Sequence, residues 1–359
     1  MQQSAFSERC LKWMEPIWAT DTVYDECLLF TQDAHGIQPC QLLFEPERIL
    51  SVRSDYYGAE YQEGLDYTRA GRTLCLTENS RIPYYAYDEL FLREPRILTI
   101  ESASAPGRYV RYERGGTQTQ IRQLRVSYTR AGGWALRLPP LRPEYLPKTL
   151  DRLRRGEHLH IVFYGDSIMD GCDASGRAGV MPYMPNLDKL TVMKLSDWYK
   201  HSKITFTNTS MGGMTSEWGL ENLKERVIDK APELVILKFG MNDGTRNTPP
   251  ETFAANTLAM VKRIRAELKS CEVLILGCEL PNPDCKGWTG TQEALEGALD
   301  KQISEVNGVQ IVRILDIYRQ LRARKGFYSL ATNLVNHPND FLIRLYAQLM
   351  CKALGVYGD

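Results

Sequence analysis

The sequence lacks the features that mark metal-binding, disulfide-rich and nucleic-acid-binding proteins. Its nine cysteines are scattered over 359 residues and form no C-x-x-C pair, so neither a zinc site nor a disulfide framework is expected. Lysine plus arginine and aspartate plus glutamate both number 44, so no excess charge favours nucleic acid or a membrane surface. We therefore expect no metal, no cofactor and a small, weakly charged partner.

Long apolar runs are also missing. Glu8, Glu15, Asp21 and Asp25 interrupt the first 30 residues, which excludes the apolar core of a signal peptide. Nowhere do 18 uncharged apolar residues follow one another, as a membrane-spanning helix would need. These absences predict a cytoplasmic protein that does not engage a membrane. A hydrophobic fraction of 43% is nevertheless enough to build substantial cores.

The first 145 residues are predicted to form an all-β sandwich, resembling a jelly roll. Short extended segments are separated there by glycines at positions that suit chain reversals, such as Gly71 and Gly107. The prolines between Pro139 and Pro147 cannot join a regular ladder, because each lacks a backbone donor, and we place the domain boundary there. The predicted domains are 1–145 and 146–359, and the expected strands of the first are 42–44, 49–52, 73–77, 97–100, 109–112 and 124–128.

The second domain alternates apolar runs with helical patterns. Because strands that alternate with helices form parallel sheets with right-handed crossovers, we expect a five-stranded parallel sheet between helices. Helix 250–269, for example, keeps apolar residues at helical spacing and has Pro250 in its first turn. The expected strands are 159–164, 204–208, 234–239, 273–277 and 309–315, and the expected helices are 187–201, 217–230, 250–269, 291–306 and 341–354.

Polar motifs stand at the ends of these elements. Ser167 follows the first strand of the second domain, at the carboxyl edge where open α/β sheets bind ligands. It can attack a carbonyl, and His337, just before the last helix, can take its proton. The backbone N–H groups of Ser167 and Gly213 and the side-chain amide of Asn242 are candidate donors to an oxyanion. Ester hydrolysis requires this set of groups.

The motifs around these residues resemble the blocks of the SGNH, or GDSL-type, esterase and acylhydrolase superfamily. Ser167, Gly213, Asn242 and His337 match its four named residues, and the resemblance covers about 155–359. It implies a three-layer α/β/α, flavodoxin-like fold and a serine-hydrolase mechanism without a metal. The preceding β-sandwich is similar to the arrangement in carbohydrate esterase family 2. That likeness implies removal of a short acyl group, such as acetyl, from a carbohydrate or another small hydroxylated substrate.

One position departs from the superfamily pattern. Leu334 stands three residues before His337, where the superfamily usually has an aspartate that orients the imidazole. The resemblance favours a Ser-His dyad in which a backbone carbonyl takes that role, and Asn333, Asp316 and Asp340 are the alternatives. Two other functions stay open. One is a catalytically weak or inactive carbohydrate-binding protein, and the other is a general acylhydrolase or thioesterase of the same fold.

Four further residues are candidates for the substrate pocket: Asp166, Tyr183, Asp243 and Trp288. Tyr183 lies in a loop, 171–185, that is too long for an ordinary entry into a helix. Trp288 follows the fourth strand of the second domain and can either stack on a sugar ring or cover the core. Asp166 and Asp243 neighbour Ser167 and Asn242, where loop-forming and helix-capping roles are the alternatives.

Overall fold

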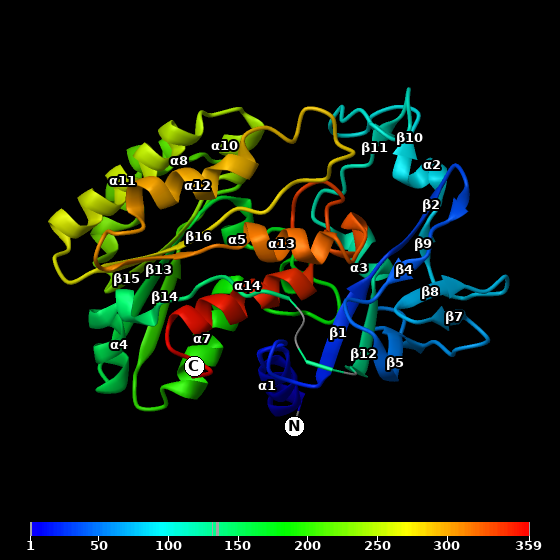
Figure 1. Cartoon of the computed structure of the whole chain (residues 1–359), viewed down its shortest axis with the longest axis horizontal. Coiled ribbons are helices and arrows are strands. Elements are labelled where there is room, and N and C mark those ends of the chain that lie inside the picture. The colour runs from blue at the N-terminus through cyan, green and yellow to red at the C-terminus, as the bar shows by residue number, and fades with distance from the viewer. Residues whose placement is uncertain (1, 131, 134–135, 359) are drawn as a thin grey trace.

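The computed structural model describes residues 2–130, 132–133 and 136–358. Two halves lie side by side, an α/β half on a parallel sheet and a half rich in antiparallel strands (Figure 1). Between them the proline-rich stretch contains one short 3-10 turn, Pro143–Tyr145, before helix α4 (Pro147–Arg154) begins. Pro147 occupies the first position of that helix, where a missing N–H costs nothing. The division into domains 1–145 and 146–359 remains a prediction.

The parallel sheet is confirmed. Its strand order is β14-β13-β15-β16-β17, and every neighbouring pair is parallel. The connections change direction at β13 and β15, and in sheets of this type a ligand-binding crevice forms at the carboxyl ends of such strands. The strand bounds are β13 (Leu159–Gly165), β14 (Ile204–Asn208), β15 (Leu234–Lys238), β16 (Glu272–Leu276) and β17 (Val309–Val312).

Helices cover both faces of this sheet, so the predicted three-layer arrangement is confirmed (Figure 1). Val162 and Val235 point to one helical layer, whereas Ile161 and Ile236 point to the other, because successive strand residues alternate between faces. One layer contains α8 (Ser216–Glu221), α11 (Pro250–Glu267) and α12 (Gln292–Ile303), and the other α7 (Leu187–Trp198), α13 (Leu315–Arg322) and α14 (Asp340–Ala353).

Helix α14 joins the two halves. All its residues except Lys352 are buried, because it packs against α7 and β17 on one side and β1 (Thr22–Leu28) on the other. A helix that is covered on all sides is an internal element. The apolar cluster around α14 therefore includes residues of both halves, such as Leu28 and Val126 of the antiparallel half and Phe163 of the parallel sheet.

The amino-terminal half is rich in antiparallel strands. Its largest sheet has the order β1-β12-β5-β6, with antiparallel neighbours. Segments 42–44 and 97–100 are not strands, which corrects two predictions. The strand bounds are β2 (Phe30–Asp33), β3 (Gly36–Ile37), β4 (Cys40–Gln41), β5 (Pro46–Ser54), β6 (Ala59–Glu60), β7 (Tyr67–Ala70), β8 (Thr73–Leu76), β9 (Tyr84–Tyr85), β10 (Phe91–Leu92), β11 (Tyr109–Val110) and β12 (Leu124–Arg130).

Shorter helices complete the molecule. The predicted helix 217–230 is broken into α8, α9 (Leu223–Arg226) and a 3-10 turn, Ile228–Lys230. The other helices are α1 (Gln2–Trp13), α2 (Tyr87–Leu90), α3 (Thr117–Arg122), α5 (Ser167–Asp170), α6 (Ser175–Ala178), α10 (Met241–Thr245) and a 3-10 turn, Phe327–Ser329. No helix among the residues that the structure describes is long and apolar enough to cross a membrane.

The last strand ends earlier than predicted, at Val312, and Leu315 begins α13. The cause is Glu296 of α12, whose Oε1 accepts hydrogen bonds from the backbone N–H of Ile314 at 2.8 Å and of Leu315 at 3.0 Å. This carboxylate satisfies donors that a starting helix leaves without partners. The contact crosses between separate elements, so local sequence patterns cannot reveal it.

Glu296 gives a stability prediction. Burial raises its pKa from 4.5 to about 7, although the backbone N–H groups of Ile314 and Leu315 oppose the rise. The folded state thus binds this proton more tightly than the unfolded chain, and the carboxylate costs stability as pH rises from 4.5 to 7. Glu296→Gln should therefore change stability in a pH-dependent way. The unfolding free energy of the variant minus that of wild type should be roughly 3 kcal/mol larger at pH 8 than at pH 4.5. Urea unfolding at both pH values measures this, and an equal effect at both would contradict it.

Candidate active site

Ser167 and His337 meet at the carboxyl edge of the parallel sheet. Ser167 is the first residue of α5, separated from the end of β13 by Asp166, and its Oγ lies 2.8 Å from Nε2 of His337. His337 comes from the loop before α14, 170 residues further along the chain. The side chains are almost buried, yet 6% of Ser167 and 7% of His337 remain exposed. An imidazole in this position can take the proton of a serine hydroxyl that attacks a carbonyl.

The second imidazole nitrogen contacts a carboxylate that the sequence analysis did not identify. Nδ1 of His337 lies 2.5 Å from Oδ2 of Asp173, in the loop between α5 and α6. Ser167, His337 and Asp173 therefore form a hydrogen-bonded serine-histidine-aspartate chain. This arrangement replaces the backbone carbonyl that we expected beside the imidazole. The one sequence signal was an acidic residue in the unusually long loop that follows Ser167.

Two of the three alternative orienting residues form ion pairs with arginines and not with His337. Asp316 lies in the first turn of α13, where its Oδ2 is 3.0 Å from the Arg137 guanidinium and 46% of its side chain is exposed. Asp340 is buried in an ion pair of 2.7 Å with Arg125. Neither carboxylate is the partner of His337, and both predictions are wrong for this role.

Asn333 acts on the backbone around His337. Its Oδ1 accepts hydrogen bonds from the N–H groups of Val335, Asn336 and His337, at 3.0, 2.8 and 2.9 Å. Such bonds are common where asparagine fixes a tight turn. Asn333 therefore shapes the loop that presents the imidazole, while Nδ1 of the ring faces Asp173.

Leu334 is fully buried, which explains why no acid occupies its position. Its backbone adopts a left-handed conformation with φ of 70°, and its side chain packs with Val335 into an apolar cluster. Most of that cluster comes from the antiparallel half, including Leu29, Tyr85 and Phe91. An aspartate here would place a carboxylate among apolar side chains. The Leu334 side chain therefore forms part of the apolar contact between the two halves.

The predicted oxyanion donors come from neighbouring strand ends. Gly213, after β14, has φ of 81°, a backbone conformation that favours glycine. A Cβ at Gly212 would lie 3.6 Å from Cβ of Ser167, whereas a Cβ at Gly213 would have no atom within 4 Å. Asn242, in α10 after β15, donates one amide N–H to the carbonyl of Met214 at 3.0 Å. That bond links the loops after β14 and β15.

Asp166 and Asp243 support the backbone and are shielded from solvent, with exposures of 0%. Oδ1 of Asp166 caps α5 by accepting the N–H of Ile168 at 3.0 Å. Asp243 accepts the backbone N–H and the hydroxyl of Ser216, and burial raises its pKa. Because neither side chain is exposed, neither can contact a substrate in this conformation, which corrects the prediction for both.

A buried cation lies behind the turn that carries Ser167. Nζ of Lys238, the last residue of β15, lies 3.7 Å from Oδ2 of Asp166 and 3.3 Å from Oε2 of Glu279. Burial raises the pKa of Glu279, and Lys238 opposes that rise. The ammonium group thus balances negative charge where the carboxyl ends of β13 and β15 meet.

Tyr183 and Trp288 have different surroundings. Tyr183 is 51% exposed and lines a pocket of about 620 Å³ that Asp170 of α5 also lines, and none of Ser167, Asp173 and His337 lines it. Trp288 is half-buried and packs against the apolar cluster that contains Leu334. The remaining lining residues of the pocket are Gly176, Arg177, Pro185, Asn186, Asp188, Lys189 and Asn208.

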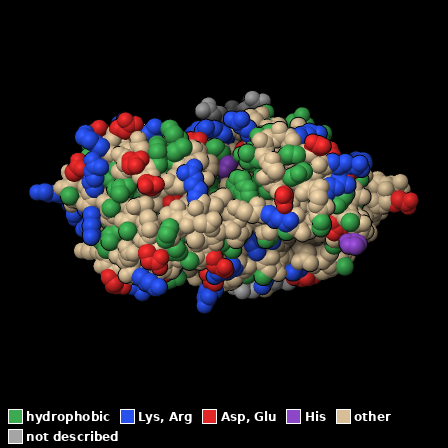
Figure 2. All heavy atoms as spheres, turned by 90° about the horizontal axis from the view of Figure 1, so that it is seen from above, with side chains coloured by type: hydrophobic (Ala, Val, Ile, Leu, Met, Phe, Trp, Pro, Cys, Tyr) green, Lys and Arg blue, Asp and Glu red, His purple; other side chains and the backbone are tan. Residues whose placement is uncertain are grey.

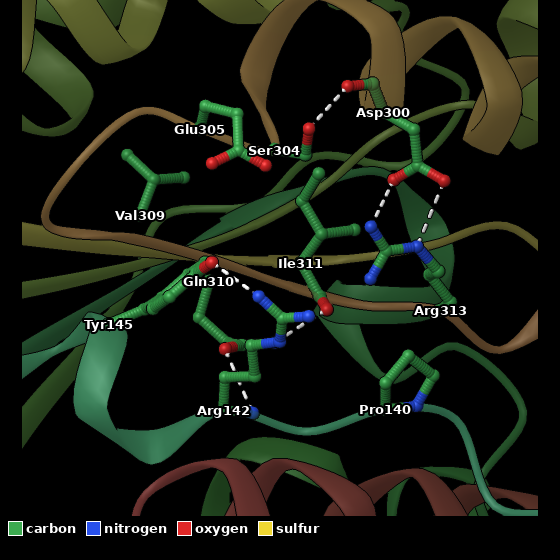
Figure 3. A pocket seen from close by; sticks show the side chains of 10 residues that line it. All are labelled: Pro140, Arg142, Tyr145, Asp300, Ser304, Glu305, Val309, Gln310, Ile311 and Arg313. Carbon is green, nitrogen blue, oxygen red and sulfur yellow. Dashed lines mark hydrogen bonds and ion pairs between the residues drawn. The ribbon is translucent and has the colours of Figure 1, made fainter.

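A second pocket, of about 240 Å³, lies at the sheet edge formed by β17 (Figure 3). None of Ser167, Asp173 and His337 lines it. Two of its polar contacts are an ion pair between Arg313 and Asp300 and a hydrogen bond from the backbone N–H of Arg142 to the Gln310 side chain. Within the described part of the chain, no group of three histidine, cysteine, aspartate or glutamate side chains is arranged to hold a metal ion.

Comparison with known proteins shows that part of this chain matches a protein family. The GDSL-like Lipase/Acylhydrolase family matches residues 163–341, about half of the chain. Among curated proteins, Esterase TesA of Pseudomonas aeruginosa is 38% identical over 74 residues, which are 21% of this chain and 36% of that protein. An arylesterase of Vibrio mimicus is 34% identical over 62 residues, 17% of this chain and 31% of that protein. The chain thus spans about a third of the length of these relatives.

Solved structures show a more distant similarity. A two-domain esterase (CEX) active on acetylated mannans has a TM-score of 0.48 and 22% identity, over 58% of this chain and 52% of that one. A catalytic mutant of Axe2, an acetylxylan esterase from Geobacillus stearothermophilus, has a TM-score of 0.45 and 18% identity. That match covers 55% of this chain and 94% of the other.

The serine-histidine contact predicts selective labelling. A fluorophosphonate probe should attach to Ser167, because His337 can remove the hydroxyl proton during attack. Asp173→Asn should slow labelling by about 10³-fold or more, since the imidazole loses its carboxylate partner. The matched control Asp316→Asn should stay within about twofold, because it changes a surface ion pair. Intact-mass spectrometry follows the adduct, and equal slowing in both variants would contradict the assignment of Asp173.

Proposed function

Because residues 163–341 belong to the GDSL-like Lipase/Acylhydrolase family, we propose that this protein is a carboxylic ester hydrolase with Ser167 as its nucleophile. The observation that carries the proposal is the hydrogen-bonded chain from Ser167 through His337 to Asp173, with distances of 2.8 and 2.5 Å. A nucleophile, a base and a carboxylate in this order support acyl transfer to a serine.

In the proposed reaction, Oγ of Ser167 attacks the acyl carbonyl while Nε2 of His337 takes the hydroxyl proton. The tetrahedral intermediate collapses when His337 returns this proton to the leaving alcohol, which leaves an acyl group on Ser167. Water then attacks the acyl-enzyme with His337 as base, and the acid departs as Ser167 regains its proton. The Asp173 carboxylate accepts a hydrogen bond from the Nδ1–H group, which keeps its proton, and stabilises the imidazolium that forms in both steps.

Three donors are proposed to bind the oxyanion of the intermediate: the N–H groups of Ser167 and Gly213 and the Asn242 amide. Ser167 is the first residue of α5, so its N–H is not used within that helix. One amide hydrogen of Asn242 binds the Met214 carbonyl, and an amide nitrogen carries two, so the second remains for the oxyanion.

The proposed substrate is a short acyl ester, such as an acetyl ester, of a carbohydrate or another small hydroxylated molecule. The pocket lined by Asp170 and Tyr183 supports this proposal, because the amide, carboxylate and guanidinium groups among its lining residues can form hydrogen bonds with hydroxyl groups. The exposed ring of Tyr183 at this pocket offers a face on which a sugar can stack.

Ester hydrolysis is tested with p-nitrophenyl acetate. The wild-type protein should release nitrophenol with turnover, and Ser167→Ala and His337→Ala should each lower kcat by about 10⁴-fold or more. The rate should fall from acetyl to octanoyl esters if the acyl site is short. Acetate release from an acetylated oligosaccharide tests the carbohydrate part. A wild-type protein that binds the oligosaccharide but turns over neither ester would instead be a carbohydrate-binding protein of this fold.

The oxyanion role of Asn242 is tested separately. Asn242→Ala should lower kcat by about 10²- to 10³-fold with a smaller change in KM, because the bond forms fully only in the transition state. Asn247→Ala, an exposed residue a few positions along the chain, is the control and should leave kcat within about twofold. If Asn242→Ala raised KM and left kcat unchanged, the amide would bind substrate without stabilising the oxyanion.

A further inference from the structure

We propose that Gln120 of the antiparallel half is a positioning residue for Asp173, so that the two halves build one active site. The inference rests on the proposed roles of Asp173 and His337. Gln120 lies in α3, which packs against α6 where the halves meet (Figure 1). Its side chain is 2% exposed, and its amide group binds Asp173, Asp340 and Arg125.

The backbone of Asp173 needs external support. It has φ of 69°, in the left-handed region that costs a residue with a Cβ about 1 kcal/mol or more. It lies between two helices of four residues each, α5 and α6, which are too short to fix the connecting loop by themselves. Contacts from other elements must therefore hold the carboxylate against Nδ1 of His337.

Gln120 contacts the loop that carries Asp173 directly. Its Nε2 donates to the backbone carbonyl of Asp173 at 3.0 Å and to Oδ1 of Asp340 at 3.2 Å. The same Oδ1 accepts the backbone N–H of Ser175 at 3.0 Å. The amide of Gln120 and the carboxylate of Asp340 thus hold the loop on both sides of residue 174.

Arg125 of β12 fixes both of these groups. Its guanidinium donates to Oε1 of Gln120 at 2.9 Å and to Oδ2 of Asp340 at 2.7 Å, and its side chain is 3% exposed. Asp340 stands three residues after His337, at the start of α14. The network of Gln120, Arg125 and Asp340 therefore touches the loop of Asp173 and lies next to the loop of His337.

Gly116, just before α3, brings the antiparallel half against the same loop. A Cβ at Gly116 would lie 2.8 Å from Cβ of Asp173 and closer still to Cγ2 of Thr332, and its φ is 66°. No side chain fits between these surfaces. The antiparallel half is thus in direct contact with the loop that carries the carboxylate.

Two matched variants test the role of Gln120 in catalysis. Gln120→Met keeps the length of the side chain and removes its hydrogen bonds. It should lower kcat by about 10- to 100-fold with little change in KM, because the imidazole loses a well-placed partner while the pocket stays intact. Gln348→Met is the control. Gln348 is also buried and joins α14 to the amino-terminal segment through the Trp13 and Glu15 carbonyls, yet it touches neither catalytic loop.

A double-mutant cycle separates positioning from general damage. If Gln120 acts through Asp173, Gln120→Met should reduce kcat by less than about twofold in the Asp173→Asn background. The proposal is overturned if Gln120→Met lowers kcat in the Asp173→Asn background as much as in the wild type. It is also overturned if Gln348→Met lowers kcat as much as Gln120→Met does. Should Gln120→Met fail to fold, Gly116→Ala replaces it, because its Cβ would displace the same loop, with the same expectation in the cycle.

A readout that needs no turnover distinguishes this proposal from the proposed function. The Nδ1 proton of His337, bonded to Asp173, should give a far-downfield proton NMR signal that disappears in Asp173→Asn. We expect Gln120→Met to shift or remove this signal and Gln348→Met to preserve it. That result in a protein without esterase activity would refute the proposed function and leave the positioning role intact. A signal unchanged by Gln120→Met, or absent from the wild type, overturns the positioning role.

Discussion

The imidazole of His337, held between the hydroxyl of Ser167 and the carboxylate of Asp173, is the contact on which the proposed chemistry depends. A serine hydroxyl is a weak nucleophile until a base takes its proton, and the base must keep one orientation to do so. The parallel sheet fixes the position of Ser167, because only Asp166 separates it from the end of β13, where the strand connections change direction. His337 and Asp173 both come from loops, so their placement requires contacts beyond the sheet.

Some of those contacts come from the antiparallel half, because Gln120 binds the Asp173 carbonyl. The buried ion pair of Arg125 and Asp340 crosses between the halves, and so does the ion pair of Lys325 with Glu26. Removal of one partner from such a pair typically costs about 3–5 kcal/mol, since the other charge stays buried. Surface charges, by contrast, are of both signs and interspersed, and the surface is hollowed between the halves (Figure 2). The interface therefore serves the stability of the fold and the geometry of the site together.

The sequence predicted the parallel sheet because its signals are local. Strand β14 begins and ends where the pattern indicated, and the other four strands differ by a few residues at their ends. Strand β1 escaped prediction since Asp25 and Glu26 interrupt its apolar pattern, and both carboxylates find partners far along the chain. In the site, the motifs identified Ser167 and His337 by their position at element ends.

The role of Asp173 could not be predicted from the sequence, and the reason is physical. The position of its carboxylate depends on a left-handed turn that residues far along the chain hold in place. Asp316 and Asp340, by contrast, lie at the starts of helices, where acidic residues are common. Asp316 is turned to the surface because Glu296 starts α13 early, and Asp340 is bound by Arg125. Leu334 contributes apolar packing between the halves at the position where an acid was expected.

A crystal structure of the protein after reaction with a short alkyl fluorophosphonate tests the central contact most directly. The account predicts a covalent bond from phosphorus to Oγ of Ser167, with the phosphoryl oxygen facing the Gly213 N–H and the Asn242 amide. It also predicts that Nδ1 of His337 stays within hydrogen-bond distance of Asp173. An adduct on another residue, or an imidazole whose Nδ1 binds a group other than Asp173, would contradict the account.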